Sequence, residues 1–468
     1  MPTLYEVEHL HQPDGWLSPG FLEVGDDGQI LSVSARCPAG RRAEKLAGYG
    51  VPGLSNLHSH AFQRALAGRT EFVTGALAED NLWTWRKEMY RMVDRLTPEA
   101  YEAIAALVYL EMLKFGMTAV CEFHYVHHQS GGAHFANPAE MSDRLIAAAA
   151  DTGLGLTLLP VLYAHGGIGK PAEPTQQRFV HDVDAYLALI DTLRSRRTDH
   201  PDLHIGLALH SLRAVTPEEA KAALAGMNAL DPQARLHIHV SETTHEVAEV
   251  EAGLGARPVQ WLLDNTGLDD RWCLVHATHL DASEIAGAAA SGAVAGLCPL
   301  TEATMGDGFF PLVEYHQAGG AWGIGTDSHY ATSIAEELRM LECGKRLELR
   351  RRNVIAQPSA TGPVHSGPVH SGRVHFDMAL RGGEQASGQG GGALIIGRRA
   401  DLLMLDADRN VLLGHGPQTA LDAWMLGGTE NPVRDVMIGG KWVVRGGYHP
   451  QEARIKANYR AAMAQLTT

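Results

Sequence analysis

The chain has 468 residues, of which 45% are hydrophobic and 20% are charged, and its formal net charge is −15 at pH 7. This length suits a large α/β barrel with an appended domain, and the ordinary composition argues against disorder and fibrous repeats. The excess of acidic groups repels phosphate backbones and anionic lipid, and no apolar run approaches the roughly 20 residues that span a bilayer. We therefore expect neither nucleic acid nor membrane as a partner.

Residues 1–48 have the pattern of short strands separated by turns such as Asp-Asp-Gly at 26–28. The opening segment carries acidic residues and no apolar stretch of the kind found in signal peptides. The five cysteines are scattered without C-x-x-C spacing, which argues against a disulfide framework. We therefore expect a cytoplasmic protein with free thiols.

Residues 49–375 alternate eight short apolar or β-branched runs with helical patterns. Helix starts are marked by capping signals such as Thr97-Pro98, and Gly116 marks a helix end. Alternation of this kind favours a parallel sheet, and eight strands favour closure, so we predict an α/β fold with a (β/α)8 barrel of the TIM type. The runs are 51–60, 118–126, 155–163, 204–212, 235–242, 272–280, 293–301 and 321–329.

Beyond the barrel, residues 359–376 contain an imperfect six-residue repeat with His365, His370 and His375, and 382–392 are rich in glycine. This composition predicts a flexible surface loop. Residues 376–468 then show short strands with glycine and aspartate turns, followed by a helix. We expect these strands to pair with residues 1–48 in one small β-sandwich domain.

Polar side chains cluster at the carboxyl ends of six of the eight predicted strands. Strands of a parallel barrel are buried on both faces, and their carboxyl ends converge on the active site, so polar residues there need a functional reason. A single histidine at the end of a strand is more often structural. The occurrence of polar residues at the same end of several strands favours one shared site. The residues are His58, His60, Tyr125, His210, Arg213, His239, Glu242, His276 and Asp327.

His58 and His60 are two residues apart, so both can face the barrel axis. Neutral imidazoles together with the carboxylate of Asp327 suit Zn²⁺ or a similar metal that leaves a position for water. A bound metal lowers the pKa of water toward about 7. We expect one divalent ion, Zn²⁺, although the same donors also accept Fe²⁺ or Mn²⁺.

The order of these residues resembles the amidohydrolase superfamily, with H-x-H after the first strand, histidines after the fifth and sixth, and aspartate after the eighth. The fourth strand ends in "LALHSLR", without the lysine that bridges two metals in binuclear members, which favours one metal. The "HVSE" at 239–242 resembles the mononuclear deaminase branch. Within it, "GLSNLHSHAFQRALAGR", "LWTWRKEMY" and "GIGTDSH" resemble the N-formimidoyl-L-glutamate deiminase family.

The resemblance implies hydrolysis of N-formimidoyl-L-glutamate to N-formyl-L-glutamate and ammonia, and a homodimer like those common in the superfamily. His276 with Asp327 would orient and deprotonate the attacking water, and Glu242 would protonate the departing nitrogen. The implied metal ligands are His58, His60, His239 and Asp327.

A substrate with two carboxylates needs cations, and the planar fork of arginine matches a carboxylate well. Arg86 and Arg213 are the candidates for this role, unless they are solvated loop charges. Tyr125 and Gln63 could add polar contacts, and His210 is expected near the metal or the formimidoyl group.

Two other functions remain open at this point. A deaminase of a cyclic amidine such as guanine or another purine could use the same metal site, but a neutral ring needs amide and aromatic partners rather than paired arginines. A catalytically inactive scaffold is the second alternative. The complete set of expected ligands argues against it.

Overall fold

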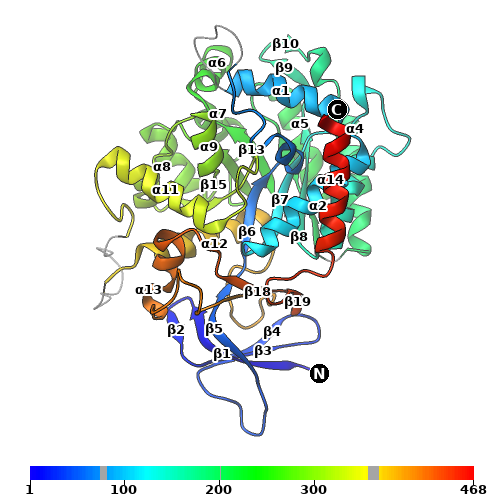
Figure 1. The fold of residues 1–468 in the computed structure, drawn as a ribbon. Coiled ribbons are helices and arrows are strands. Elements are labelled where there is room, and N and C mark those ends of the chain that lie inside the picture. The colour runs from blue at the N-terminus through cyan, green and yellow to red at the C-terminus, as the bar shows by residue number, and fades with distance from the viewer. Residues whose placement is uncertain (74–81, 201, 357–367, 468) are drawn as a thin grey trace.

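The computed structural model of the protein describes residues 1–73, 82–200, 202–356 and 368–467. It shows a barrel of parallel strands surrounded by helices, and a second sheet at one end to which both ends of the chain contribute (Figure 1). No helix in these four ranges combines the length and the apolarity needed to cross a membrane.

Eight parallel strands form the barrel and follow one another around it in chain order. They match the eight predicted runs, so the predicted α/β fold with a (β/α)8 barrel is confirmed. A short additional strand, β11 (Leu203–Ile205), pairs with β8. The barrel strands are β6 (Leu54–Ser59), β7 (Met117–His124), β8 (Gly155–Leu162), β12 (Leu207–Leu209), β13 (Leu236–Val240), β14 (Trp272–His276), β15 (Val294–Leu297) and β16 (Ala321–Ile324).

The barrel closes where β6 meets the segment that follows β16. Ser59 and Asp327 form a parallel bridge there. The His60 N–H donates to the carbonyl oxygen of Asp327 at 3.1 Å, and the Asp327 N–H donates to the carbonyl oxygen of His58 at 3.0 Å. This seam therefore places two histidines and the aspartate of the predicted site side by side.

Local sequence explains where many of the surrounding helices begin and end. In α5 the Thr216 hydroxyl oxygen accepts from the N–H of Glu219, whose carboxylate accepts in return from the Thr216 N–H. Helix α6 ends at Gly255, whose φ of 78° is left-handed. The helices of the barrel are α1 (Leu82–Arg95), α2 (Pro98–Lys114), α3 (Glu140–Thr152), α4 (Val183–Arg194), α5 (Pro217–Leu230), α6 (Thr244–Leu254), α7 (Pro258–Asn265), α8 (Ala282–Ser291), α9 (Pro299–Met305), α10 (Leu312–Gln317) and α11 (Ile334–Leu349).

The two ends of the chain pair with each other, as predicted, and hydrogen bonds join their strands into one mixed sheet. The order is β19-β18-β17-β5-β1-β3-β4, with β2 beside β1, and β5 pairs in parallel with β1. Its strands are β1 (Thr3–Gln12), β2 (Gly15–Leu17), β3 (Gly20–Val24), β4 (Ile30–Ser34), β5 (Glu44–Pro52), β17 (Leu402–Leu405), β18 (Val433–Ile438) and β19 (Lys441–Val444).

Smaller elements complete the fold. A hairpin of β9 (His165–Gly167) and β10 (Lys170–Pro171) follows β8, and the 3-10 helix η1 (Ala61–Leu66) follows β6. Helix α13 (Pro417–Asp422) lies between β17 and β18. The terminal helix α14 (Glu452–Thr467) packs beside α2, where Lys114 and Glu452 form an ion pair of 2.9 Å (Figure 1).

The prediction of a flexible loop was wrong for residues 371–387, which form helix α12 (Ser371–Ser387). This helix packs against the first residues of β6 and β16. A Cβ at Gly382 would collide with the backbone of Trp322, and a Cβ at Gly383 would lie 2.7 Å from the Ser55 carbonyl oxygen. The glycines therefore permit close packing of a helix rather than a loop.

The histidines of the same segment are also structural where they are described. The His375 ring lies 3.2 Å from the Glu342 carboxylate, and neither side chain is exposed. The His370 ring lies 2.6 Å from the Asp422 carboxylate. His365 lies outside the described residues.

The predicted domain boundaries, after residues 48 and 375, fall inside β5 and α12. One residue, Gly53, separates β5 of the terminal sheet from β6 of the barrel. The two parts are therefore joined by continuous elements, and a division into 1–48, 49–375 and 376–468 stays a prediction.

Candidate active site

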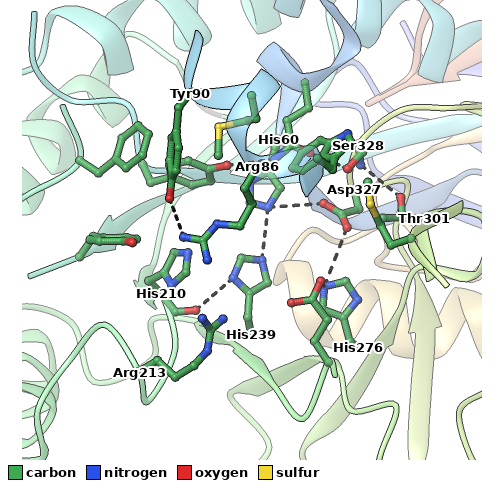
Figure 2. Close-up of a pocket in the computed structure, with 18 residues that line it drawn as sticks. His60, Arg86, Tyr90, His210, Arg213, His239, His276, Thr301, Asp327 and Ser328 are labelled. Carbon is green, nitrogen blue, oxygen red and sulfur yellow. Dashed lines mark hydrogen bonds and ion pairs between the residues drawn. The ribbon is translucent and has the colours of Figure 1, made fainter. Parts of the chain in front are cut away.

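The predicted site residues come together at the carboxyl ends of the barrel strands (Figure 2). His58 is completely buried, and its ring contacts those of His60 and His239. The other predicted residues all line one pocket: His60, Gln63, Arg86, Tyr125, His210, Arg213, His239, Glu242, His276 and Asp327.

Three imidazoles converge in this pocket. The Nε2 atoms of His58 and His60 are 3.1 Å apart, those of His58 and His239 are 3.1 Å apart, and those of His60 and His239 are 3.2 Å apart. Strand alternation brings His58 and His60 to the same face of β6, and His239 comes from β13 on the other side of the barrel.

The opposite ring nitrogens show how two of these imidazoles are oriented. His60 Nδ1 lies 2.8 Å from the Phe123 carbonyl oxygen, and His239 Nδ1 lies 3.0 Å from that of His210. Because a carbonyl oxygen can only accept, both Nδ1 atoms carry the hydrogen and both Nε2 atoms present a lone pair. Burial lowers the pKa of all three imidazoles, which keeps them neutral.

This arrangement fits a metal ion. The Nε2 lone pairs of His60 and His239 face each other at 3.2 Å and repel unless a cation lies between them. Zn–N bonds of about 2.0–2.1 Å at tetrahedral angles place nitrogen donors about 3.3–3.4 Å apart, close to the observed spacing. One Asp327 oxygen, Oδ1, lies 3.5 Å from His58 Nε2 and 3.4 Å from His60 Nε2, so it can act as a fourth donor.

His276 lies between carboxylates. Its Nε2 is 3.6 Å from Glu242 Oε1 and 3.8 Å from Asp327 Oδ2, and its Nδ1 is 3.4 Å from Glu302 Oε1. Burial lowers the pKa of His276, but the three carboxylates outweigh burial and raise it to about 10. The ring is thus held with Nδ1 toward Glu302 and Nε2 toward the pocket.

Backbone strain is concentrated at these strand ends. Ser241 has a φ of 53°, His276 of 67° and Asp327 of 44°, all in the left-handed region that non-glycine residues rarely adopt. Each such residue costs on the order of 1–3 kcal/mol and persists only where the surrounding structure enforces it, as at active sites.

The side of the pocket away from Asp327 carries the two arginines (Figure 2). Arg86 donates to the Tyr90 hydroxyl at 2.6 Å, and Arg213 is only 8% exposed. His210 lies on this side of the pocket, with its ring centroid 5.2 Å from that of His239 (Figure 2). Burial, followed by Arg213 and Arg86, lowers the pKa of His210 well below its ordinary value, so this imidazole is neutral.

Gln63, Tyr125 and Ser328 form a directed chain of hydrogen bonds on the pocket wall. The Ser328 hydroxyl donates to Gln63 Oε1 at 2.5 Å, and Gln63 Nε2 donates to the Tyr125 hydroxyl at 2.9 Å. Burial raises the pKa of Tyr125 well above its ordinary value, so the hydroxyl keeps its hydrogen. Because its oxygen already accepts from Gln63, that hydrogen is available to a ligand.

Several residues that line the pocket or contact its side chains from behind were not predicted. Glu302 lies in the first turn of α9, a few residues beyond the end of β15, so a search one turn past each strand would have found it. Tyr90 is on α1 rather than on a strand. Further lining residues that the sequence did not indicate are Met89, Tyr163, Phe179, Thr301, Met305 and Ser328.

Comparisons with known proteins agree with this geometry. A protein of Pseudomonas aeruginosa named formimidoylglutamate deiminase is 47% identical over 461 residues, which cover 98% of each chain. A crystal structure described as an amidohydrolase from Brucella melitensis is 40% identical, covers 100% of both chains and superposes with a TM-score of 0.91. A zinc-bound structure described as an adenosine deaminase from Xanthomonas campestris shares the fold at 22% identity, with a TM-score of 0.81 over 99% of this chain and 98% of its own.

The match to a family covers most of the chain. Residues 49–443 fit the sequence profile of the amidohydrolase family, a range that includes every predicted site residue. The barrel, the three converging imidazoles and the near full-length homology to a deiminase all agree with that match. The chain therefore belongs to the amidohydrolase family.

Proposed function

We propose that the protein is a metal-dependent deiminase that hydrolyses N-formimidoyl-L-glutamate to N-formyl-L-glutamate and ammonia. The observation that carries this proposal is the presence of Arg86 and Arg213 in the same pocket as the histidines and Asp327, within a chain of net charge −15. Two guanidinium groups beside a hydrolytic centre suit an amidine that bears two carboxylates. The name of the P. aeruginosa relative supports the same substrate.

The metal in this proposal is one Zn²⁺ ion, since three imidazoles and one carboxylate are donors that zinc prefers. When bound, the ion would lower the pKa of a water molecule toward about 7 and so supply a nucleophile at neutral pH. Its proposed ligands are His58, His60, His239 and Asp327.

Three side chains, those of Asp327, His276 and Glu242, would orient the water and transfer protons. Asp327 turns Oδ1 toward the histidine cluster and Oδ2 toward His276, so the two residues can orient the water. Asp327 takes the water proton, because His276, with its pKa raised to about 10, is already protonated near neutral pH. Glu242, 3.6 Å from His276 Nε2, can pass a proton to the amidine nitrogen. The water oxygen then forms the new C=O bond as the C–N bond breaks, and the nitrogen leaves as ammonia.

The side of the pocket away from Asp327 would bind the glutamate part of the substrate. Arg86 and Arg213 would bind carboxylates, and the Tyr125 hydroxyl, held by Gln63, would donate a further hydrogen bond. The neutral ring of His210, 5.2 Å from that of His239, would contact the formimidoyl group.

Ammonia release tests the proposal. Purified protein supplied with Zn²⁺ is incubated with N-formimidoyl-L-glutamate and, separately, with guanine. We expect ammonia from the first only, because guanine carries no carboxylate for the arginines. Ammonia from guanine alone would identify a cyclic amidine deaminase instead, and no ammonia from either substrate would point to an inactive scaffold.

We also propose a cytoplasmic homodimer. All five cysteines are free, as expected in a reducing compartment. The dimer is the state that the family resemblance implies, and light scattering during size-exclusion chromatography measures it directly.

A further inference from the structure

The barrel seam contains buried polar residues that have no part in the chemistry described above. Ser59 lies between the two histidines of β6, and strand alternation turns its side chain away from the metal site. His329 follows Asp327 by two residues, and Glu122 is on the neighbouring strand β7. All three side chains are fully buried.

These residues belong to one continuous chain of hydrogen bonds. Asn56 Nδ2 donates to Thr326 Oγ1 at 2.7 Å, and Thr326 Oγ1 lies 2.9 Å from His329 Nδ1. His329 Nε2 lies 3.0 Å from Ser59 Oγ, which donates to Glu122 Oε2 at 2.5 Å. The chain thus connects β6 to the segment after β16, returns to β6 and ends on β7.

One arrangement of hydrogens satisfies this chain when Glu122 is ionised. The carboxylate can only accept, so it takes hydrogens from the Ser59 hydroxyl and from the Ala61 N–H, the latter at 2.7 Å. Ser59 Oγ then accepts from His329 Nε2–H, and His329 Nδ1 accepts from the Thr326 hydroxyl. A fully satisfied buried network of this kind holds its members in a single geometry.

Burial disfavours the ionised form of Glu122. Burial raises the pKa of Glu122 to about 8, although hydrogen bonds from Ser59 and Ala61 lower it. Within the described part of the chain, none of the salt bridges involves this carboxylate. A metal ion held by His58 and His60, on either side of Ser59, would favour the ionised form.

We propose that Ser59, Glu122 and His329 are positioning residues of the metal site. They hold β6 against the segment after β16 at the spacing that the ligands on these two elements need. Once a dication is bound, the ionised form of Glu122 would supply a buried negative charge that balances it. This role concerns the affinity for metal and is independent of which amidine the protein hydrolyses.

Zinc affinity of the chain without substrate tests the proposal. Zn²⁺ is titrated into metal-depleted protein against a chromophoric chelator, for the unaltered chain, Glu122→Gln and Ser59→Ala. Mutation of residues that support metal ligands through hydrogen bonds typically weakens metal binding by about 10–100-fold. We therefore expect the zinc dissociation constant to rise by about that factor in both variants. In Glu122→Gln the amide oxygen can accept from the Ala61 N–H, but the NH2 group can only donate to Ser59 Oγ. The variant therefore removes the charge and also reverses the hydrogen bond between residue 122 and Ser59.

The matched control is Glu284→Gln. Glu284 is also fully buried and accepts from the backbone N–H groups of Val259 and Gln260, but it lies on α8, apart from the seam. The zinc affinity of the Glu284→Gln variant should equal that of the unaltered chain. Unchanged zinc affinity in Glu122→Gln and Ser59→Ala would overturn the proposal. This holds even if these variants unfold at a lower denaturant concentration than the unaltered chain. If Glu122→Gln does not fold, Ser59→Ala, which removes a single oxygen atom, decides alone.

Discussion

At the scale of single residues, the hydrogen-bond partners of the histidine rings fix the position of the ring hydrogen and the orientation of each ring. The carbonyl oxygens of Phe123 and His210 keep a hydrogen on the outer nitrogens of His60 and His239. The inner nitrogens therefore present lone pairs, and Glu302 holds the ring of His276 in the same way from the far side. Backbone carbonyls and one buried carboxylate thus prepare the side chains that the proposed reaction uses.

Arg213→Ala should raise KM for N-formimidoyl-L-glutamate by about 10–100-fold, because hydrogen bonds to charged groups contribute about 1.5–3 kcal/mol. The value of kcat should fall much less, since the proposal assigns Arg213 to carboxylate binding rather than to proton transfer. Steady-state ammonia assays separate the two constants. Arg213→Lys should recover only part of the loss, because lysine lacks the planar fork.

The matched control is Arg434→Ala on β18, whose guanidinium pairs with Asp435 in the terminal sheet. Its KM should not change. An unaltered KM in Arg213→Ala would remove this residue from substrate binding.

Most of the candidate site could be predicted because its residues follow strands at regular places. His58, His60, His239 and His276 all stand at or near the carboxyl ends of runs whose apolar pattern is clear. Tyr90 could not be found in this way because it reaches the pocket from helix α1, and helix orientation depends on tertiary packing.

At the scale of elements, the strands and helix starts follow from local sequence, whereas α12 does not. Capping residues such as Thr216 and Asp281 mark helix starts by hydrogen bonds within one turn. The glycines of α12 argue locally against a helix, since glycine has a low helix propensity. They are explained by the backbones of β6 and β16 against which the helix packs.

Gly383→Ala should lower the free energy of unfolding by about 1–3 kcal/mol, as overpacking in a dense core does. Helix propensity alone predicts a gain of about 1 kcal/mol, so the sign of the change separates the two explanations. Urea denaturation measures it. Gly390→Ala is the control, because a Cβ there meets no atom within 4 Å. A Gly383→Ala variant as stable as the unaltered chain would contradict the close packing of α12.

At the scale of the whole molecule, buried histidines connect stability to pH. His124, His127, His128 and His181 are buried and form a cluster with the exposed His134, and the rings of His127 and His181 are 4.5 Å apart. Burial, then the neighbouring imidazoles, lowers the pKa of His124 and of His181 to about 3. These two rings are therefore neutral in the folded chain at every pH near neutrality.

The chain should lose stability in mild acid. Above about pH 6.5 neither the folded nor the unfolded state protonates these imidazoles, so their neutral form costs nothing there. Below that pH the unfolded state takes up protons that the folded state cannot, and each histidine lowers the free energy of unfolding by about 1.4 kcal/mol per pH unit until about pH 3.

Urea midpoints at pH 7, 6 and 5 measure this decline, and His181→Gln should make it shallower. Equal midpoints at pH 7 and pH 5 would show that the buried rings are protonated in the folded chain.

The central claim is that one metal ion at His58, His60, His239 and Asp327 activates water for the hydrolysis of N-formimidoyl-L-glutamate. Its most direct test is ammonia release from this substrate by metal-depleted protein as Zn²⁺ is added back. Ammonia release should start near zero and reach a plateau at about one zinc ion per chain. Full release without metal, or none from folded protein saturated with zinc, would contradict it.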